Sequence, residues 1–301
     1  MITEKTVYAC RLSPKDCQQN AVAVDGDQAD QLNYRGTGRL ESRAVTYVNL
    51  GFQFLEQENT EGALACFSRV VELEPDNPEA YNNLGYVYEI TDRLSSARYM
   101  YRKALELDEK NVEAIINIAN THDLEGDYHG ALLNYRMALS IDPDHVNAHF
   151  CLAVLYDRHD MFDEAASHYQ EVLARDPLHR KAIFNLGNLY IQTGNYQNAV
   201  EQLQLLLELH PDDAEAWNNL GSLHEEQADM EKALSAWHQC LRLNPLQEEA
   251  NFNLARVQYS LWKSKPMDLD KQQIIDRLTF VLALDQRCEK AKTLLKEIMQ
   301  T

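Results

Sequence analysis

The chain has 301 residues, of which 45% are hydrophobic and 25% charged, so it is long enough to bury a core and polar enough to dissolve. Its formal net charge of −19 repels phosphate backbones, which argues against nucleic acid as a partner and favours basic or neutral polypeptides. The N-terminus lacks the apolar core of a signal peptide, and the longest apolar run, at 203–209, is too short to cross a bilayer. We therefore expect a soluble, cytoplasmic protein without membrane insertion.

Residues 1–43 match no repeating pattern. They contain the loop-like steps Asp25-Gly26-Asp27 and Gly36-Thr37-Gly38. We expect an N-terminal extension that is largely irregular or mobile.

A 34-residue repeat begins at residue 44. The octets NNLGYVYE at 82–89 and NNLGSLHE at 218–225 lie four periods apart, and units begin at 44, 78, 112, 146, 180, 214 and 248. Within each unit, small or apolar residues at repeat positions 4, 7, 8 and 11 mark one face of a first helix. A second stripe at positions 20, 24 and 27 marks a second helix, and proline at position 32 ends five of the units.

The two helices of a unit are expected to pack as a hairpin. Small residues at positions 8 and 20, such as Gly85 with Ala97, are predicted to let them approach closely. Since the chain has no alternating period-2 run, the pattern favours an all-α stack in which each hairpin covers its neighbours.

The seventh unit departs from this pattern near 263–270, where KSKPMDLD interrupts it as an insertion. The repeats therefore span 44–286. Residues 287–301 then form one more amphipathic helix, polar on its outer side, which is typical of a capping helix on an open array.

These residue types at these positions resemble the tetratricopeptide repeat (TPR) superfamily. The resemblance covers residues 44–286 and implies a right-handed α-solenoid superhelix of seven helix–turn–helix hairpins plus the capping helix. It also implies that the first helices line a concave groove, and that the protein binds other proteins and is not an enzyme.

Repeat position 6 lies roughly opposite the packed face of the first helix and is asparagine in six of seven units. An asparagine amide matches the donor and acceptor of an extended peptide bond, so such a ladder can hold a ligand backbone. The pattern resembles the asparagine ladder of the O-GlcNAc transferase TPR domain. Alternatively, these asparagines serve local hydrogen bonding, as is common in this family. With two asparagines at position 9, the candidate amides are Asn49, Asn83, Asn117, Asn120, Asn185, Asn188, Asn219 and Asn253.

Other outward positions are apolar in the first four units and polar to acidic later. An exposed apolar patch that no hairpin needs usually marks a binding site. We expect one at Phe52, Tyr86, Ile90, Leu124 and Val154, unless the N-terminal extension or tight packing covers it. Lys181 joins the candidate peptide-binding residues, and the partner's basic residues are expected toward 215–249.

No catalytic, cofactor or metal motif accompanies the repeats. The histidines at packed positions, such as His122 and His149, are expected in the core, and no Cys/His cluster or phosphate-binding glycine loop is present. The sequence therefore predicts a non-catalytic adaptor or scaffold without cofactor or metal, which binds a protein or peptide in its groove. The alternative is a self-assembling scaffold that forms homo-oligomers through the groove or the N-terminal extension.

Overall fold

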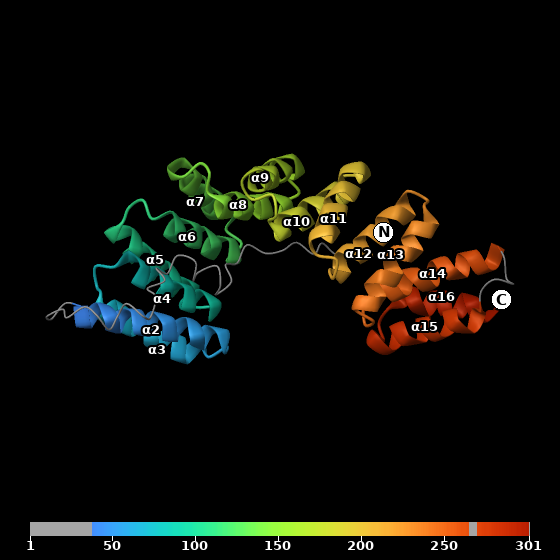
Figure 1. Ribbon diagram of the computed structural model, residues 1–301, viewed down its shortest axis with the longest axis horizontal. Helices are drawn as coiled ribbons and strands as arrows, with labels where there is room; N and C mark the ends of the chain where they lie inside the picture. Colours follow the sequence, from blue (N-terminus) through green and yellow to red (C-terminus); the bar gives the residue numbers. More distant parts are fainter. Residues whose placement is uncertain (1–37, 265–269, 301) are drawn as a thin grey trace. The chain divides into compact units, whose positions relative to one another are not determined.

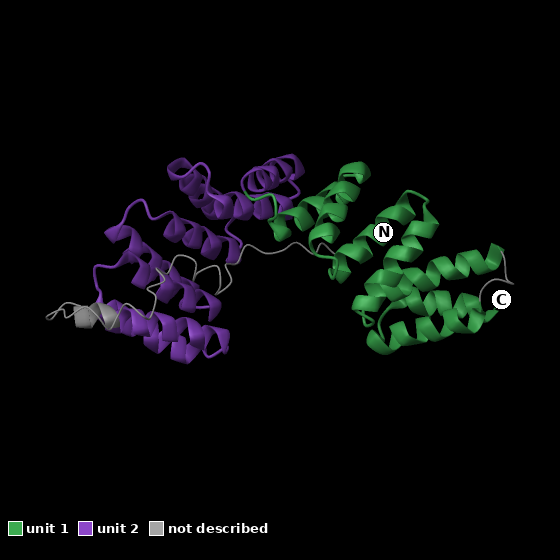
Figure 2. Cartoon of the chain, viewed as in Figure 1, with its two compact units in different colours: residues 1–8, 176–301 green, residues 9–175 purple. Residues whose placement is uncertain are grey.

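The computed structural model describes residues 38–264 and 270–300, and this part of the chain is helical without a strand. The predicted N-terminal extension up to residue 37 and most of the predicted insertion lie outside the described residues. The chain divides into two compact units, shown in Figure 2: unit 2 ends at Arg175, and the described part of unit 1 begins at Asp176 and includes the C-terminal helices. Each unit is described by itself.

Unit 2 contains four successive helix pairs (Figure 1). Its first helix begins at Gly38, so the last residues of the predicted irregular extension are helical. The two helices of each pair pack against each other, and the second helix of a pair packs against the first helix of the next. The helices are α2 (Gly38–Glu56), α3 (Thr60–Leu73), α4 (Pro78–Ile90), α5 (Leu94–Leu107), α6 (Val112–Leu124), α7 (Tyr128–Ile141), α8 (Val146–Arg158) and α9 (Phe162–Arg175).

Unit 1 continues the same pairing and ends on an unpaired helix, which packs on both α14 and α15. Its helices are α10 (Arg180–Gln192), α11 (Tyr196–Leu209), α12 (Ala214–Glu226), α13 (Met230–Leu243), α14 (Glu248–Ser264), α15 (Lys271–Leu284) and α16 (Glu289–Gln300). The long α14 and the start of α15 at Lys271 bracket the predicted insertion. All-helical hairpins that stack in chain order are the α-solenoid class that the period predicts.

The turn inside each of the first six hairpins has one recurring backbone shape. Repeat position 15 has a positive φ in these six, whether it is glycine or not: Glu58, Asp92, Gly126, Asp160, Gly194 and Ala228. In the seventh hairpin the same position, Trp262, lies inside α14. The next residue donates its N–H to a carbonyl five residues earlier, as Asp127 does to His122 at 2.8 Å. This is the left-handed helix end that satisfies the last carbonyls of the first helix.

The core of each hairpin is built on the predicted stripes. Alanine at position 20 and the large side chain at position 24 are fully buried in the pairs, for example Ala97 with Tyr101 and Ala233 with Trp237. The closest neighbour of position 8 is the large side chain of the second helix: a Cβ on Gly85 would meet the ring of Tyr101 at 2.6 Å. The glycine therefore makes room for the ring at position 24.

Buried tyrosines link the two helices of a hairpin through their hydroxyls. Tyr101 donates to Glu89 at 2.9 Å and Tyr135 donates to Asn120 at 2.6 Å. Because a buried hydroxyl must find a partner, these polar residues of the first helix are part of the packed interface.

Candidate functional site

The candidate asparagines occupy three kinds of environment. Asn49 is exposed, whereas Asn83, Asn188, Asn219 and Asn253 are half-buried. Three others have buried side chains: Asn117, Asn120 and Asn185. The structure therefore does not present these amides as one continuous accessible ladder.

Two amide pairs join consecutive first helices. Asn117 donates through Nδ2 to Asn82 Oδ1 at 2.9 Å, which links α6 to α4. Asn219 donates in the same way to Asn188 at 2.7 Å, which links α12 to α10. These contacts support a local structural role for part of the asparagine pattern.

The predicted apolar patch is largely buried in unit 2. Phe52 and Val154 are buried, and the ring of Phe52 lies edge-on to Phe67 with centroids 5.2 Å apart. Ile90 and Leu124 keep 37% and 40% of their surface exposed, and Tyr86 is half-buried. The continuous patch expected from the sequence is thus reduced to a few accessible side chains.

Unit 1 contains an open cavity of about 900 Å³ on its first helices, which we call the acidic cavity. Its walls come from α10, α12, the start of α13, α14, and the turn before α16 with the start of that helix. Five glutamates face it, against only two basic side chains. It is lined by Ile191, Asn218, Asn219, Ser222, Glu225, Glu226, Met230, Glu248, Glu249, Phe252, Asn253, Arg256, Cys288, Glu289 and Lys290.

Hydrogen bonds across the acidic cavity tie α12 to α14. Arg256 pairs with Glu225, and Asn218 donates through Nδ2 to Glu249 at 3.2 Å. Asn218 is only 3% exposed, and its buried Oδ1 accepts no hydrogen bond in the described structure. The cavity therefore combines an uncommitted acceptor with excess negative charge.

Neighbouring carboxylates add to this negative field. Burial raises the pKa of Glu215, and the charges of Asp213 and Glu249 raise it further, although Arg180 opposes them. Arg180 itself pairs with Asp213, the N-cap of α12. A cation placed among these groups would relieve their mutual repulsion.

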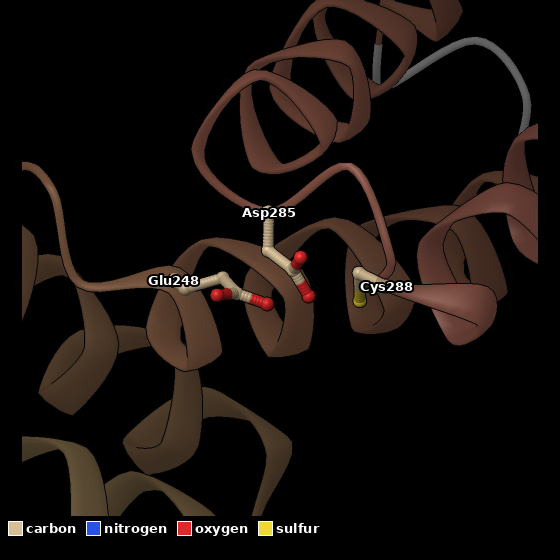
Figure 3. A group of neighbouring side chains, drawn as sticks. All are labelled: Glu248, Asp285 and Cys288. Atoms are coloured by element: carbon tan, nitrogen blue, oxygen red, sulfur yellow. The ribbon is translucent and has the colours of Figure 1, made fainter.

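One group of three donor side chains could hold a metal ion at the edge of this cavity. Figure 3 shows Glu248 from the start of α14 with Asp285 and Cys288 from the turn between α15 and α16. Their ligand atoms lie within 4.8 Å of one another, and all three residues are half-buried. Asp285 Oδ1 also accepts the Arg287 N–H at 2.8 Å, a normal turn contact. No sequence motif indicates this group, because Glu248 is remote in the chain from the other two residues.

Family comparisons follow the same repeats. Models described as "Tetratricopeptide repeat" match residues 158–223 and, separately, 78–111 and 214–246, and one described as "TPR repeat" matches 51–89 and 124–159. The chain belongs to the tetratricopeptide repeat superfamily. TPR units are in general non-catalytic modules for protein interaction, so the chain is a TPR protein of the scaffold type.

Solved structures show the same TPR fold at low sequence identity. YrrB, described as "a TPR protein with an unusual peptide-binding site", is 22% identical, with 61% of this chain and 95% of that chain covered and a TM-score of 0.52. PilF of Pseudomonas aeruginosa is 20% identical, with 72% and 99% covered and a TM-score of 0.62. A TPR protein of Parabacteroides merdae is 18% identical, with 86% and 99% covered and a TM-score of 0.55.

No curated protein matched the chain. The resemblance of the TPR groove to that of O-GlcNAc transferase is not shown by these comparisons and stays a prediction. Among the described helices, none has the length and apolar character needed to cross a membrane.

Proposed function

We propose that this TPR protein is a non-catalytic adaptor that binds a polypeptide segment along its first helices. The observation that carries the proposal is the acidic cavity. Most of its lining residues stand at repeat positions 2, 5, 6, 9, 12 and 13, which lie off the face that packs within the hairpin. A concave surface with a few placed polar groups is the usual form of a binding site.

The chemistry of the acidic cavity supports a peptide with basic residues. Asn219 and Asn253 lie in its wall, where each amide can bond a peptide backbone for about 0.5–1.5 kcal/mol net. The glutamates favour positive charge in the partner. YrrB, a protein of the same fold, is described as having a peptide-binding site, which supports the same mode here.

We propose that unit 2 contributes to binding through those of its predicted peptide-binding residues that remain accessible. Asn49, Tyr86, Ile90 and Leu124 remain on or near the surface. The proposal does not depend on the buried side chains of the set.

Photo-crosslinking tests the binding surface. The photoreactive residue p-benzoylphenylalanine replaces Ser222, which lines the acidic cavity, or Glu201, which is exposed on α11 outside it. Irradiation in a cell extract should join partner peptides, identified by mass spectrometry, to the Ser222 variant only. When Asn219→Ala and Asn253→Ala are added to the Ser222 variant, its crosslinking yield should fall. Equal yields at the two sites, or none at Ser222, would contradict the proposal.

Self-assembly is the second candidate, and one observation favours it. Leu133 and Met137, four residues apart on α7, keep 70% and 45% of their surface exposed. A second copy of the chain could cover such side chains. Light scattering after size exclusion decides this point, since a monomer at all concentrations excludes self-assembly.

A cytoplasmic location is also part of the proposal. Fractionation of cells that express the full chain checks it, and recovery with membranes or outside the cell would contradict it.

A further inference from the structure

The acidic cavity holds an acceptor that lacks a donor. Asn218 Nδ2 is used by Glu249, so Oδ1 is the atom left to accept, and it is buried without a hydrogen bond in the described structure. A buried carbonyl oxygen without a donor has lost its hydration without gaining a hydrogen bond in return. A ligand that brings an N–H group to this oxygen therefore gains more than from the same contact at an exposed site.

The charges around Asn218 select the kind of donor. Arg256, the basic residue on α14, is already paired with Glu225. Among the described ion pairs none involves Glu249, although Asn218 hydrogen-bonds to it. The site thus offers a carboxylate and a carbonyl oxygen side by side, a set of acceptors that suits a cation with several N–H donors.

The volume and the apolar wall of the cavity further narrow the kinds of cation that fit it. Its volume of about 900 Å³ is much larger than a bare metal ion needs and admits a long side chain. Phe252, an aromatic residue, lies in the same wall. A planar guanidinium can bond a carboxylate through two N–H groups and stack on an aromatic ring, and it is more weakly hydrated than an ammonium group.

We infer that the acidic cavity holds the guanidinium of an arginine in the bound polypeptide, with Glu249 as its carboxylate partner and Asn218 Oδ1 as a further acceptor. This inference rests on the proposed function, because the arginine belongs to the peptide that the first helices hold. It adds a specific subsite and a specific side chain to that function.

The test begins with peptides of random sequence. The full chain is panned against a phage library of random dodecamers, and the recovered peptides are synthesised with a fluorescent label. Binding is measured by anisotropy for the wild type, for Glu249→Gln and for Asn219→Ala with Asn253→Ala. Glu208→Gln, at an exposed residue of α11, is the matched control. Each arginine is then replaced by citrulline, which keeps the shape and removes the charge, and separately by lysine, which keeps the charge.

Peptides that bind should share an arginine whose replacement by citrulline weakens binding about tenfold, equal to about 1.4 kcal/mol. The citrulline replacement should change the affinity of the Glu249→Gln protein little, because that protein has already lost the contact between the arginine and the Glu249 carboxylate. Circular dichroism melts confirm that the variants fold.

The outcomes distinguish failure of the arginine subsite from failure of the proposed function. Binding peptides that depend on Asn219 and Asn253, but not on arginine or Glu249, overturn the arginine subsite alone. A lysine that substitutes fully for the arginine also overturns it. If no peptide binds, or binding ignores the asparagines as well, the proposed function fails and the subsite fails with it.

Discussion

At the residue scale, the same repeat position has different packing in different hairpins. Glycine at position 8 faces a ring at position 24 in the hairpins of Gly85 and Gly221, where a Cβ would approach Tyr101 or Trp237 to 2.6 Å. At Gly187 the nearest side-chain atoms belong to Gln202 at 3.5 Å and Leu203 at 3.6 Å. Glycine at position 8 is therefore needed to make room for a ring in the hairpins of Gly85 and Gly221, whereas the hairpin of Gly187 has room for a larger residue.

We predict opposite effects for two identical substitutions. Gly85→Ala should lower the free energy of unfolding by about 1–3 kcal/mol, because the added methyl group overlaps the buried ring of Tyr101. Gly187→Ala should raise it by up to about 1 kcal/mol, because alanine favours the helix and meets ordinary contacts. Urea denaturation followed by circular dichroism measures both. Equal destabilisation by the two changes would contradict this account.

At the element scale, the turns inside the first six hairpins share one backbone conformation that most side chains disfavour. Ala228 has φ near 60°, and Gly126 and Gly194 fill the same position elsewhere. A left-handed conformation costs a non-glycine residue about 1–2 kcal/mol. Ala228→Gly should therefore raise the thermal midpoint, with a gain of about 0.5–1 kcal/mol after the entropy of glycine is counted. Gly126→Ala is the reverse control and should lower it.

The fourth hairpin carries a pH-dependent contact between α8 and α9. His149 and His168 meet through their Nδ1 atoms at 2.9 Å, and His149 Nε2 contacts the Pro143 carbonyl at 2.9 Å. Burial and the neighbouring His149 lower the pKa of His168 to about 4, although Glu171 opposes them. The contact thus holds His168 in its neutral form.

Acidification should destabilise this hairpin. The unfolded chain takes up a proton on His168 near pH 6.5 and the folded chain only near pH 4, so stability is lost as the pH falls between these values. His168→Gln should reduce the difference in urea midpoint between pH 7 and pH 5. His129→Gln, at an exposed site on α7, is the control substitution. An unchanged difference in His168→Gln would disprove the assignment.

At the scale of the whole molecule, charge sets how a partner approaches. The net charge of −19 and the glutamates of the acidic cavity attract basic peptides over a distance that salt shortens. Affinity for an arginine-containing peptide should fall several-fold from low to high salt, mainly through slower association. Stopped-flow anisotropy measures this, with a net-neutral peptide as the control. A salt-independent association rate would contradict electrostatic steering.

The sequence by itself determined the helical hairpins and their order. Each unit repeats the same local burial, so the period is visible in Ala97, Tyr101 and their counterparts without knowledge of the fold. The right-handed superhelical course, the number of repeats and the domain limits remain predictions of that period.

Only the tertiary structure decided which outward side chains are accessible. Repeats that share one sequence pattern differ in which outward side chains they bury. Asn117, Asn185 and Phe52 are buried, and Asn218 has an acceptor without a hydrogen bond. The physical reason is that a periodic pattern reports how a helix packs within its own hairpin. Contacts between hairpins depend on side chains more than 30 residues away, as the bond from Asn218 to Glu249 shows.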